Sequence, residues 1–64
     1  MIDLFEHYDK MPEDLKKVCD KWDEYNSTTG LDYNTCAQFL NEIESIGYTF
    51  DYGLDAEPYN LRKK

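Results

Sequence analysis

Residues 47–61, GYTFDYGLDAEPYNL, decide how this chain folds. After Gly47 the large apolar residues recur at every second position, which is typical of a β-strand. The alternation sets Tyr48, Phe50, Tyr52 and Leu54 against Thr49, Asp51, Gly53 and Asp55. Residues 59–63 can supply a partner strand across a turn at 55–58, but so small a hairpin needs support from helices. The segment therefore predicts either a short β-hairpin or an extended arm, packed on helices.

A short first helix is expected over residues 3–10. Asp3 and Glu6 have the spacing of a capping box, in which each residue satisfies a backbone N–H of the first turn. The apolar residues that fall on one face of this helix are Leu4, Phe5 and Tyr8. This face predicts a helix that packs against the rest of the domain.

Two longer helices are expected over residues 12–25 and 33–46. Each carries apolar residues at helical spacing, and the first begins with a proline in a position that suits it. Gly47 follows the second helix, where glycine permits a left-handed exit. The polar stretch NSTTG, residues 26–30, consists of residues that favour turns and caps, so it predicts the loop between the two helices.

These elements predict a mainly α fold class, a small three-helix domain with a C-terminal extended segment or short β-hairpin packed on the helices. At 64 residues the chain forms one domain, 1–64, close to the lower limit for independent folding. Its aromatic content of 16% allows a small core to be built from few side chains. The predicted core consists of Leu4, Phe5, Leu15, Val18, Trp22, Phe39, Leu40, Ile43, Ile46 and Phe50.

Acidic residues dominate the chain, and the net charge is −7. Between Lys21 and Arg62 there are eight acidic residues and no basic one. This sign opposes direct binding to nucleic acid or to an anionic membrane, and favours a partner protein with a basic surface. Solubility alone is the other explanation of the charge.

Enzymatic chemistry is not expected. His7 is the only histidine and has no recognisable nucleophile beside it. Two cysteines and one histidine do not make a zinc site, and the acids near residue 55 lack the spacing of a calcium loop. The three glycines are isolated, so no phosphate-binding loop is present. We therefore predict no catalytic residue, no cofactor and no metal.

A cytoplasmic location is expected. The beginning of the chain lacks the basic and apolar regions of a signal peptide, and no apolar stretch approaches the roughly 20 residues that span a bilayer. Cys19 and Cys36 fall on the apolar faces of the two long helices, where reduced, buried thiols are expected. A disulfide between these helices is geometrically conceivable.

Surface recognition is the function that remains. We predict that Asp51, Tyr52, Asp55, Glu57 and Tyr59 form an acidic-aromatic patch that binds a partner protein, because tyrosines are enriched at interface hot spots. The even-numbered residues from 48 to 54 are assigned mainly to the core, with Tyr52 undecided. One alternative is a nucleic-acid mimic that inhibits a DNA-handling or defence protein. Another is a homodimer, since a small core often recruits a second copy.

The stretch GYTFDYGLDAEPYNLRK, residues 47–63, resembles a group of small, uncharacterised acidic proteins of bacteria, their phages and mobile elements. The stretches LFEHY at 4–8 and LDYNTC at 31–36 add to the resemblance. No activity is assigned to that group. The resemblance implies a compact intracellular accessory protein, and no functional residue is carried over from it.

Overall fold

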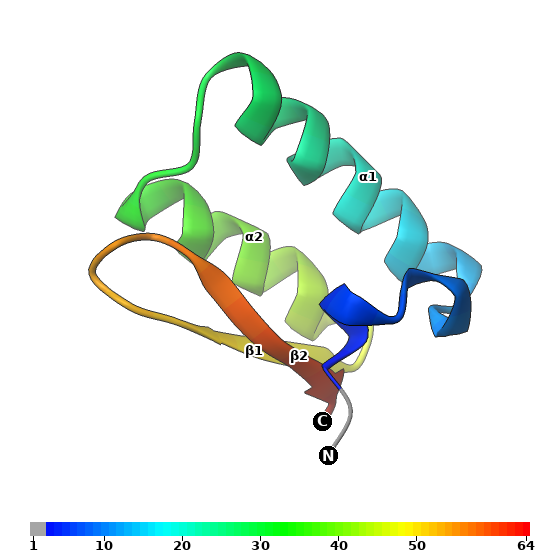
Figure 1. Cartoon of the computed structure of the whole chain (residues 1–64). Coiled ribbons are helices and arrows are strands. Elements are labelled where there is room, and N and C mark those ends of the chain that lie inside the picture. The colour runs from blue at the N-terminus through cyan, green and yellow to red at the C-terminus, as the bar shows by residue number, and fades with distance from the viewer. Residues whose placement is uncertain (1–2) are drawn as a thin grey trace.

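A computed structural model describes residues 3–64, which form two helices and a two-stranded antiparallel sheet (Figure 1). The helices are α1, Glu13–Thr28, and α2, Tyr33–Ser45. The strands are β1, Tyr48–Tyr52, and β2, Pro58–Lys63. The hairpin lies below α2 in Figure 1, and α1 lies across the other side of α2. Among residues 3–64, no helix combines the length and the apolar character that crossing a bilayer requires.

The predicted three-helix domain is wrong, because no α-helix forms over residues 3–10. Two single 3₁₀ turns stand there instead: η1, Leu4–Glu6, and η2, Tyr8–Lys10. His7 separates them with non-helical backbone angles of −130° and 57°. A segment this short cannot recover the cost of nucleating an α-helix, and 3₁₀ geometry is common in such short pieces.

The capping box predicted for the first helix is also replaced. The Asp3 carboxylate accepts a hydrogen bond from the backbone N–H of Phe5, at 3.0 Å. The same carboxylate accepts the backbone N–H groups of Asn60 and Leu61 in β2, at 2.9 and 3.1 Å. Asp3 therefore fastens the beginning of the described chain to its last strand.

Local signals explain the ends of the two long helices. Ser27 and Thr28 donate side-chain hydrogen bonds to backbone carbonyls one turn earlier, and α1 runs three residues beyond its predicted end. The Asp32 side chain caps α2 in a reciprocal box with Thr35. Gly47 has a φ of +91°, a conformation that glycine adopts without steric cost, and it turns the chain from α2 into β1.

The hairpin that the C-terminal segment allowed is present, with a bulge in β2. Tyr48 pairs with Lys63, but after Thr49 the register shifts by one residue. Phe50 consequently lies opposite two residues, Asn60 and Leu61, and Asn60 takes a positive φ of 59°. An extra residue of this kind bends a strand and increases its twist.

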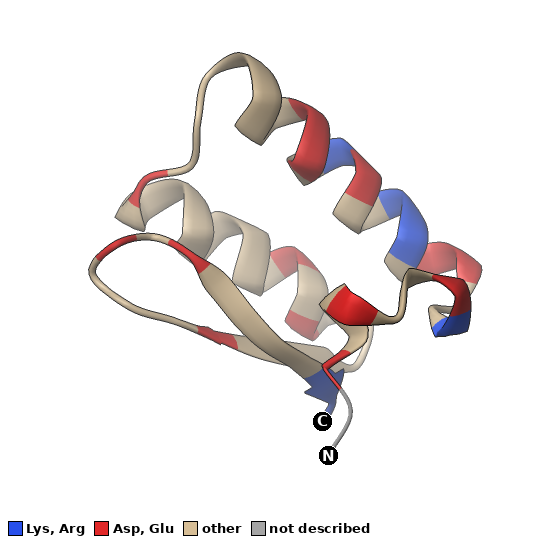
Figure 2. Cartoon of the chain, viewed as in Figure 1, with Lys and Arg blue, Asp and Glu red and all other residues tan. Residues whose placement is uncertain are grey.

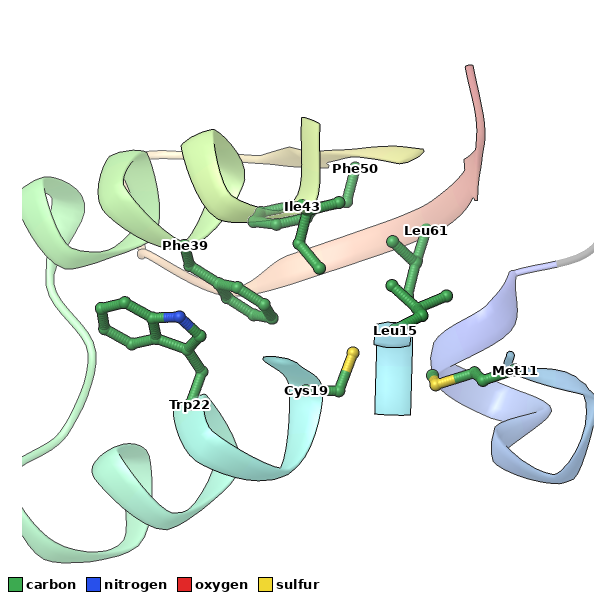
Figure 3. Packing of buried hydrophobic residues seen from close by; sticks show 8 residues of the cluster. All are labelled: Met11, Leu15, Cys19, Trp22, Phe39, Ile43, Phe50 and Leu61. Atoms are coloured by element: carbon green, nitrogen blue, oxygen red, sulfur yellow. The ribbon is translucent and has the colours of Figure 1, made fainter. Parts of the chain in front are cut away.

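The core lies where α1, α2 and the inner face of the hairpin meet (Figure 3). Five of the ten predicted core residues are buried: Leu15, Trp22, Phe39, Ile43 and Phe50. The other five are partly buried against them: Leu4, Phe5, Val18, Leu40 and Ile46. Met11 and Leu61 belong to the core although they were not predicted there. Cys19 and Cys36 are buried free thiols.

Candidate functional site

The hairpin distributes the five predicted site residues over two faces and a loop. Asp51 and Tyr59 are direct cross-strand partners, and both lie on the face opposite the buried Phe50. Tyr52 lies on the same side as Phe50, where its ring contacts Phe50 at 6.0 Å between centroids. Asp55 and Glu57 lie in the loop between the strands. The structure therefore does not bring the five residues into one patch.

Asp51 is engaged within the hairpin. Its carboxylate accepts hydrogen bonds from the Asn60 side chain and from the Arg62 guanidinium, each at 3.1 Å. The Asn60 hydrogen bond, followed by that of Arg62, holds the pKa of Asp51 below its usual value. Because Arg62 offsets its charge, Asp51 contributes little to an acidic surface.

The loop at residues 53–57, which joins the two strands, carries exposed apolar and acidic side chains. Leu54 is 94% exposed, and the two acids that follow it, Asp55 and Glu57, are exposed as well. The prediction that Leu54 belongs to the core is wrong, because β1 ends at Tyr52 and the alternation of inner and outer faces stops there. A single exposed leucine is ordinary on a protein surface, so Leu54 indicates an interaction site only together with other exposed apolar residues beside it.

The loop is held against the first turn of α2. The Cys36 thiol donates a hydrogen bond to the carbonyl of Ala56 at 3.1 Å. Burial, followed by the nearby carboxylates of Asp32 and Asp55, raises the pKa of Cys36. Tyr33 packs edge-on against Tyr52, with ring centroids 5.4 Å apart, and remains 53% exposed. These contacts place the loop and the beginning of α2 on one surface.

We call this surface the hairpin tip, defined by Tyr33, Tyr52, Leu54, Asp55 and Glu57. It keeps three of the five predicted residues and adds two that sequence reasoning missed. Tyr33 is the first residue of α2, and only its contact with Tyr52 across the fold places it at the hairpin tip. Figure 2 shows that the lysine and arginine positions lie on α1, on the first turns and at the end of β2, away from this loop.

A groove runs beside the hairpin tip, between α1, the N-terminal turns and the beginning of β2. Its volume is about 220 Å³. Trp22 and Phe39 lie against each other on its apolar wall, with ring centroids 5.6 Å apart (Figure 3). Asp20 and Asp23 supply its acidic side, while Leu31 and Pro58 adjoin the hairpin tip in sequence. The remaining lining residues are Phe5, Tyr8, Met11, Cys19 and Asn26.

Cys19 is a buried free thiol that lines the groove. Burial, with smaller contributions from Asp20 and Asp23, raises the pKa of Cys19 to about 11, so its thiol stays protonated at neutral pH. Among residues 3–64, no three histidine, cysteine or acidic side chains lie close enough together to hold a metal ion.

In comparisons with known proteins, no protein family, no curated protein and no solved structure matches this chain. The resemblance of residues 47–63 to small acidic proteins of bacteria and phages therefore stays a prediction.

Proposed function

We propose that this protein is a non-enzymatic interaction protein that binds a basic surface of a partner protein through its hairpin tip. One observation supports the proposal above the others: Leu54 is 94% exposed next to the exposed acids Asp55 and Glu57, in a loop that has no basic residue. The net charge of −7 supports a protein partner over nucleic acid or an anionic membrane. The free thiols Cys19 and Cys36 support a reducing, cytoplasmic setting.

The apolar and the acidic residues of the hairpin tip would contribute to binding in different ways. Burying a leucine side chain contributes about 1.5–3 kcal/mol, so Leu54 is the anchor. A charged pair at the rim of an interface contributes about 0–1 kcal/mol and mainly governs the association rate and the choice of partner. Asp55 and Glu57 therefore select a basic surface, while Leu54 and Tyr33 hold it.

The test is a pull-down from native cell extract with quantified capture. Asp55→Asn/Glu57→Gln removes two charges from the tip and keeps the Asp55 side-chain oxygen that accepts the Glu57 N–H. Glu6→Gln/Glu24→Gln is the matched control, since it removes two exposed charges elsewhere. Leu54→Ser removes the anchor.

We expect partner capture to fall about threefold to tenfold in the charge variant, and at least tenfold in the Leu54→Ser variant, with the control unchanged. Equal capture by all variants would contradict the proposal. Competition by duplex DNA for the captured protein would instead favour the nucleic-acid mimic. Sedimentation at two protein concentrations tests the homodimer.

A further inference from the structure

The first turns of the chain are held to the rest of the fold by few contacts. We call residues 3–10 the N-terminal strap; it contains η1 and η2 and lies between the beginning of α1 and the end of β2 (Figure 1). Its apolar residues Leu4 and Phe5 are only partly buried, and Tyr8 is 47% exposed. Segments that bury little apolar surface open locally more easily than core elements do.

The strap also leaves space beneath it. The groove of about 220 Å³ is lined by Phe5 and Tyr8 of the strap on one side and by Cys19 and Trp22 of α1 on the other. A side chain that borders such a space has no contact atoms on that face and forfeits the dispersion energy that they would supply. The strap is therefore not close-packed against α1.

Two polar clasps hold the strap, one toward each end. At the first clasp, the Asp3 carboxylate accepts the backbone N–H groups of Asn60 and Leu61 in β2. At the second, the Tyr8 hydroxyl donates to Asp20 of α1, at 2.9 Å from each carboxylate oxygen. The second clasp is exposed, so water can replace its hydrogen bond at little cost.

Ring contacts add to the two clasps. Phe5 meets Phe39 and Phe50 edge-on, with ring centroids 6.2 and 5.7 Å away. The Lys16 ammonium lies 5.3 Å from the centroid of the Tyr8 ring. Each of these contacts is individually modest. The strap is therefore attached by a small number of weak contacts that are spread along its length.

The backbone of His7 couples the two turns of the strap. Its N–H donates to the carbonyl of Leu4 at 3.1 Å and closes η1. Its carbonyl accepts the N–H of Lys10 at 2.9 Å and closes η2. One turn therefore cannot move far without disturbing the other. The coupled segment ends at Met11, which is buried in the core.

We propose that the N-terminal strap opens as a single unit while the two helices and the hairpin stay folded. Because both clasps then break together, opening frees the N–H groups of Asn60 and Leu61 on the edge of β2. It also uncovers the groove and the Cys19 thiol within it. The strap is a separate device from the hairpin tip, and this inference does not depend on the proposed function.

The two free cysteines distinguish opening of the strap from unfolding of the domain. Cys19 lines the groove beneath the strap, whereas Cys36 is buried beside the hairpin loop and bonded to the carbonyl of Ala56. Opening of the strap should therefore expose Cys19 and leave Cys36 covered. Unfolding of the whole domain exposes both thiols.

The test measures amide hydrogen exchange by NMR, together with the rate at which a disulfide reagent labels each thiol. In the wild type, the amides of His7, Met11, Asn60 and Leu61 should show one common protection factor, although they belong to two distant parts of the sequence. This factor should be at least tenfold lower than that of the core amides of α2, on the order expected for local opening.

Tyr8→Phe removes only the hydroxyl that bonds to Asp20, and Tyr33→Phe, at an exposed tyrosine of α2, is the matched control. We expect Tyr8→Phe to speed exchange at Asn60 and Leu61 about threefold to tenfold. The Tyr8 side chain makes no hydrogen bond to β2 within residues 3–64, so this effect requires the strap to open as a unit. The control should leave exchange at both amides unchanged.

The thiols should respond in the same variant. Labelling of Cys19 should become faster by the same factor in the Tyr8→Phe protein, and labelling of Cys36 should not change. From the other clasp, Asp3→Asn should speed exchange at Met11 about fivefold, because opening releases η2 as well as η1. Both substitutions nearly keep the size of the side chain, and circular dichroism verifies that the variants fold.

The inference is overturned if Tyr8→Phe leaves exchange at Asn60 and Leu61 unchanged, since the two turns then move independently. It is also overturned if labelling of Cys19 and Cys36 rises in parallel, because the clasp then acts only on unfolding of the whole domain. Strap amides as well protected as those of α2 would likewise show that the strap does not open on its own.

Discussion

Replacing Asp3 by alanine is predicted to destabilise the whole domain, although Asp3 lies near the beginning of the chain. Its carboxylate accepts three backbone N–H groups: Phe5 at 3.0 Å, Asn60 at 2.9 Å and Leu61 at 3.1 Å. Losing the cap of a helical turn costs about 1 kcal/mol. Each part-buried N–H of the bulge left without its acceptor costs about 1 kcal/mol, the lower end of the range for buried groups.

The expected loss for Asp3→Ala is therefore about 3 kcal/mol. A domain of this length has a total stability of about 3–10 kcal/mol, so the variant should unfold at a much lower urea concentration. Its midpoint of thermal unfolding should fall by about 12–24 °C. Trp22 fluorescence and far-UV circular dichroism follow both transitions.

Two further variants test whether the Asp3 carboxylate fastens β2. Asp3→Asn keeps one side-chain oxygen as acceptor and should lose only about 1 kcal/mol. Asp9→Ala removes a neighbouring exposed acid whose side chain has no hydrogen bond within residues 3–64, and should change stability by less than about 0.5 kcal/mol. If Asp3→Ala and Asp9→Ala unfold at the same urea concentration, Asp3 does not fasten β2.

Three further outcomes are expected. Leu61→Ala should lower the free energy of unfolding in urea by about 2–5 kcal/mol, because Leu61 is fully buried. Leu54→Ala should lower it by less than about 0.5 kcal/mol, because Leu54 is 94% exposed, and equal losses would contradict the hairpin register. Hydrogen bonds lower the pKa of Asp51, so its charged form stabilises the fold above about pH 4 and this contribution is lost as the pH falls. The free energy of unfolding of Asp51→Asn should therefore decrease less between neutral and acidic pH than that of the wild type. At pH 8, Cys19 should react with a disulfide reagent on the order of a hundred times more slowly than after denaturation, and rapid labelling of the folded protein would refute its burial.

The two long helices were predictable because their information is local. In α1 the apolar residues recur every three or four positions, and in α2 a capping residue and Gly47 mark the two ends. The strand β1 was predictable for the same reason, since its alternation is contained in five residues. Whether it paired as a hairpin or lay as an extended arm was not, because pairing depends on the partner strand and on helix support.

The N-terminal segment shows why the rest was not predictable. Leu4, Phe5 and Tyr8 have helical spacing, but Asp3 is bonded to residues 57 and 58 positions away. No local pattern reports such a contact, and none reports that Asn60 takes a positive φ. The candidate site follows the same rule: Asp55 and Glu57 were predicted from composition, whereas Tyr33 joins them only through the fold.

The bond between Asp3 and Leu61 has a practical consequence for protein engineering. It holds the two ends of the described chain side by side, at the opposite end of the hairpin from its loop (Figure 1). A short linker between these ends should close the chain into a ring with little distortion, and new ends can be opened in the loop at 29–32 between α1 and α2. A fluorescent or affinity label fused at either end would leave the hairpin tip uncovered.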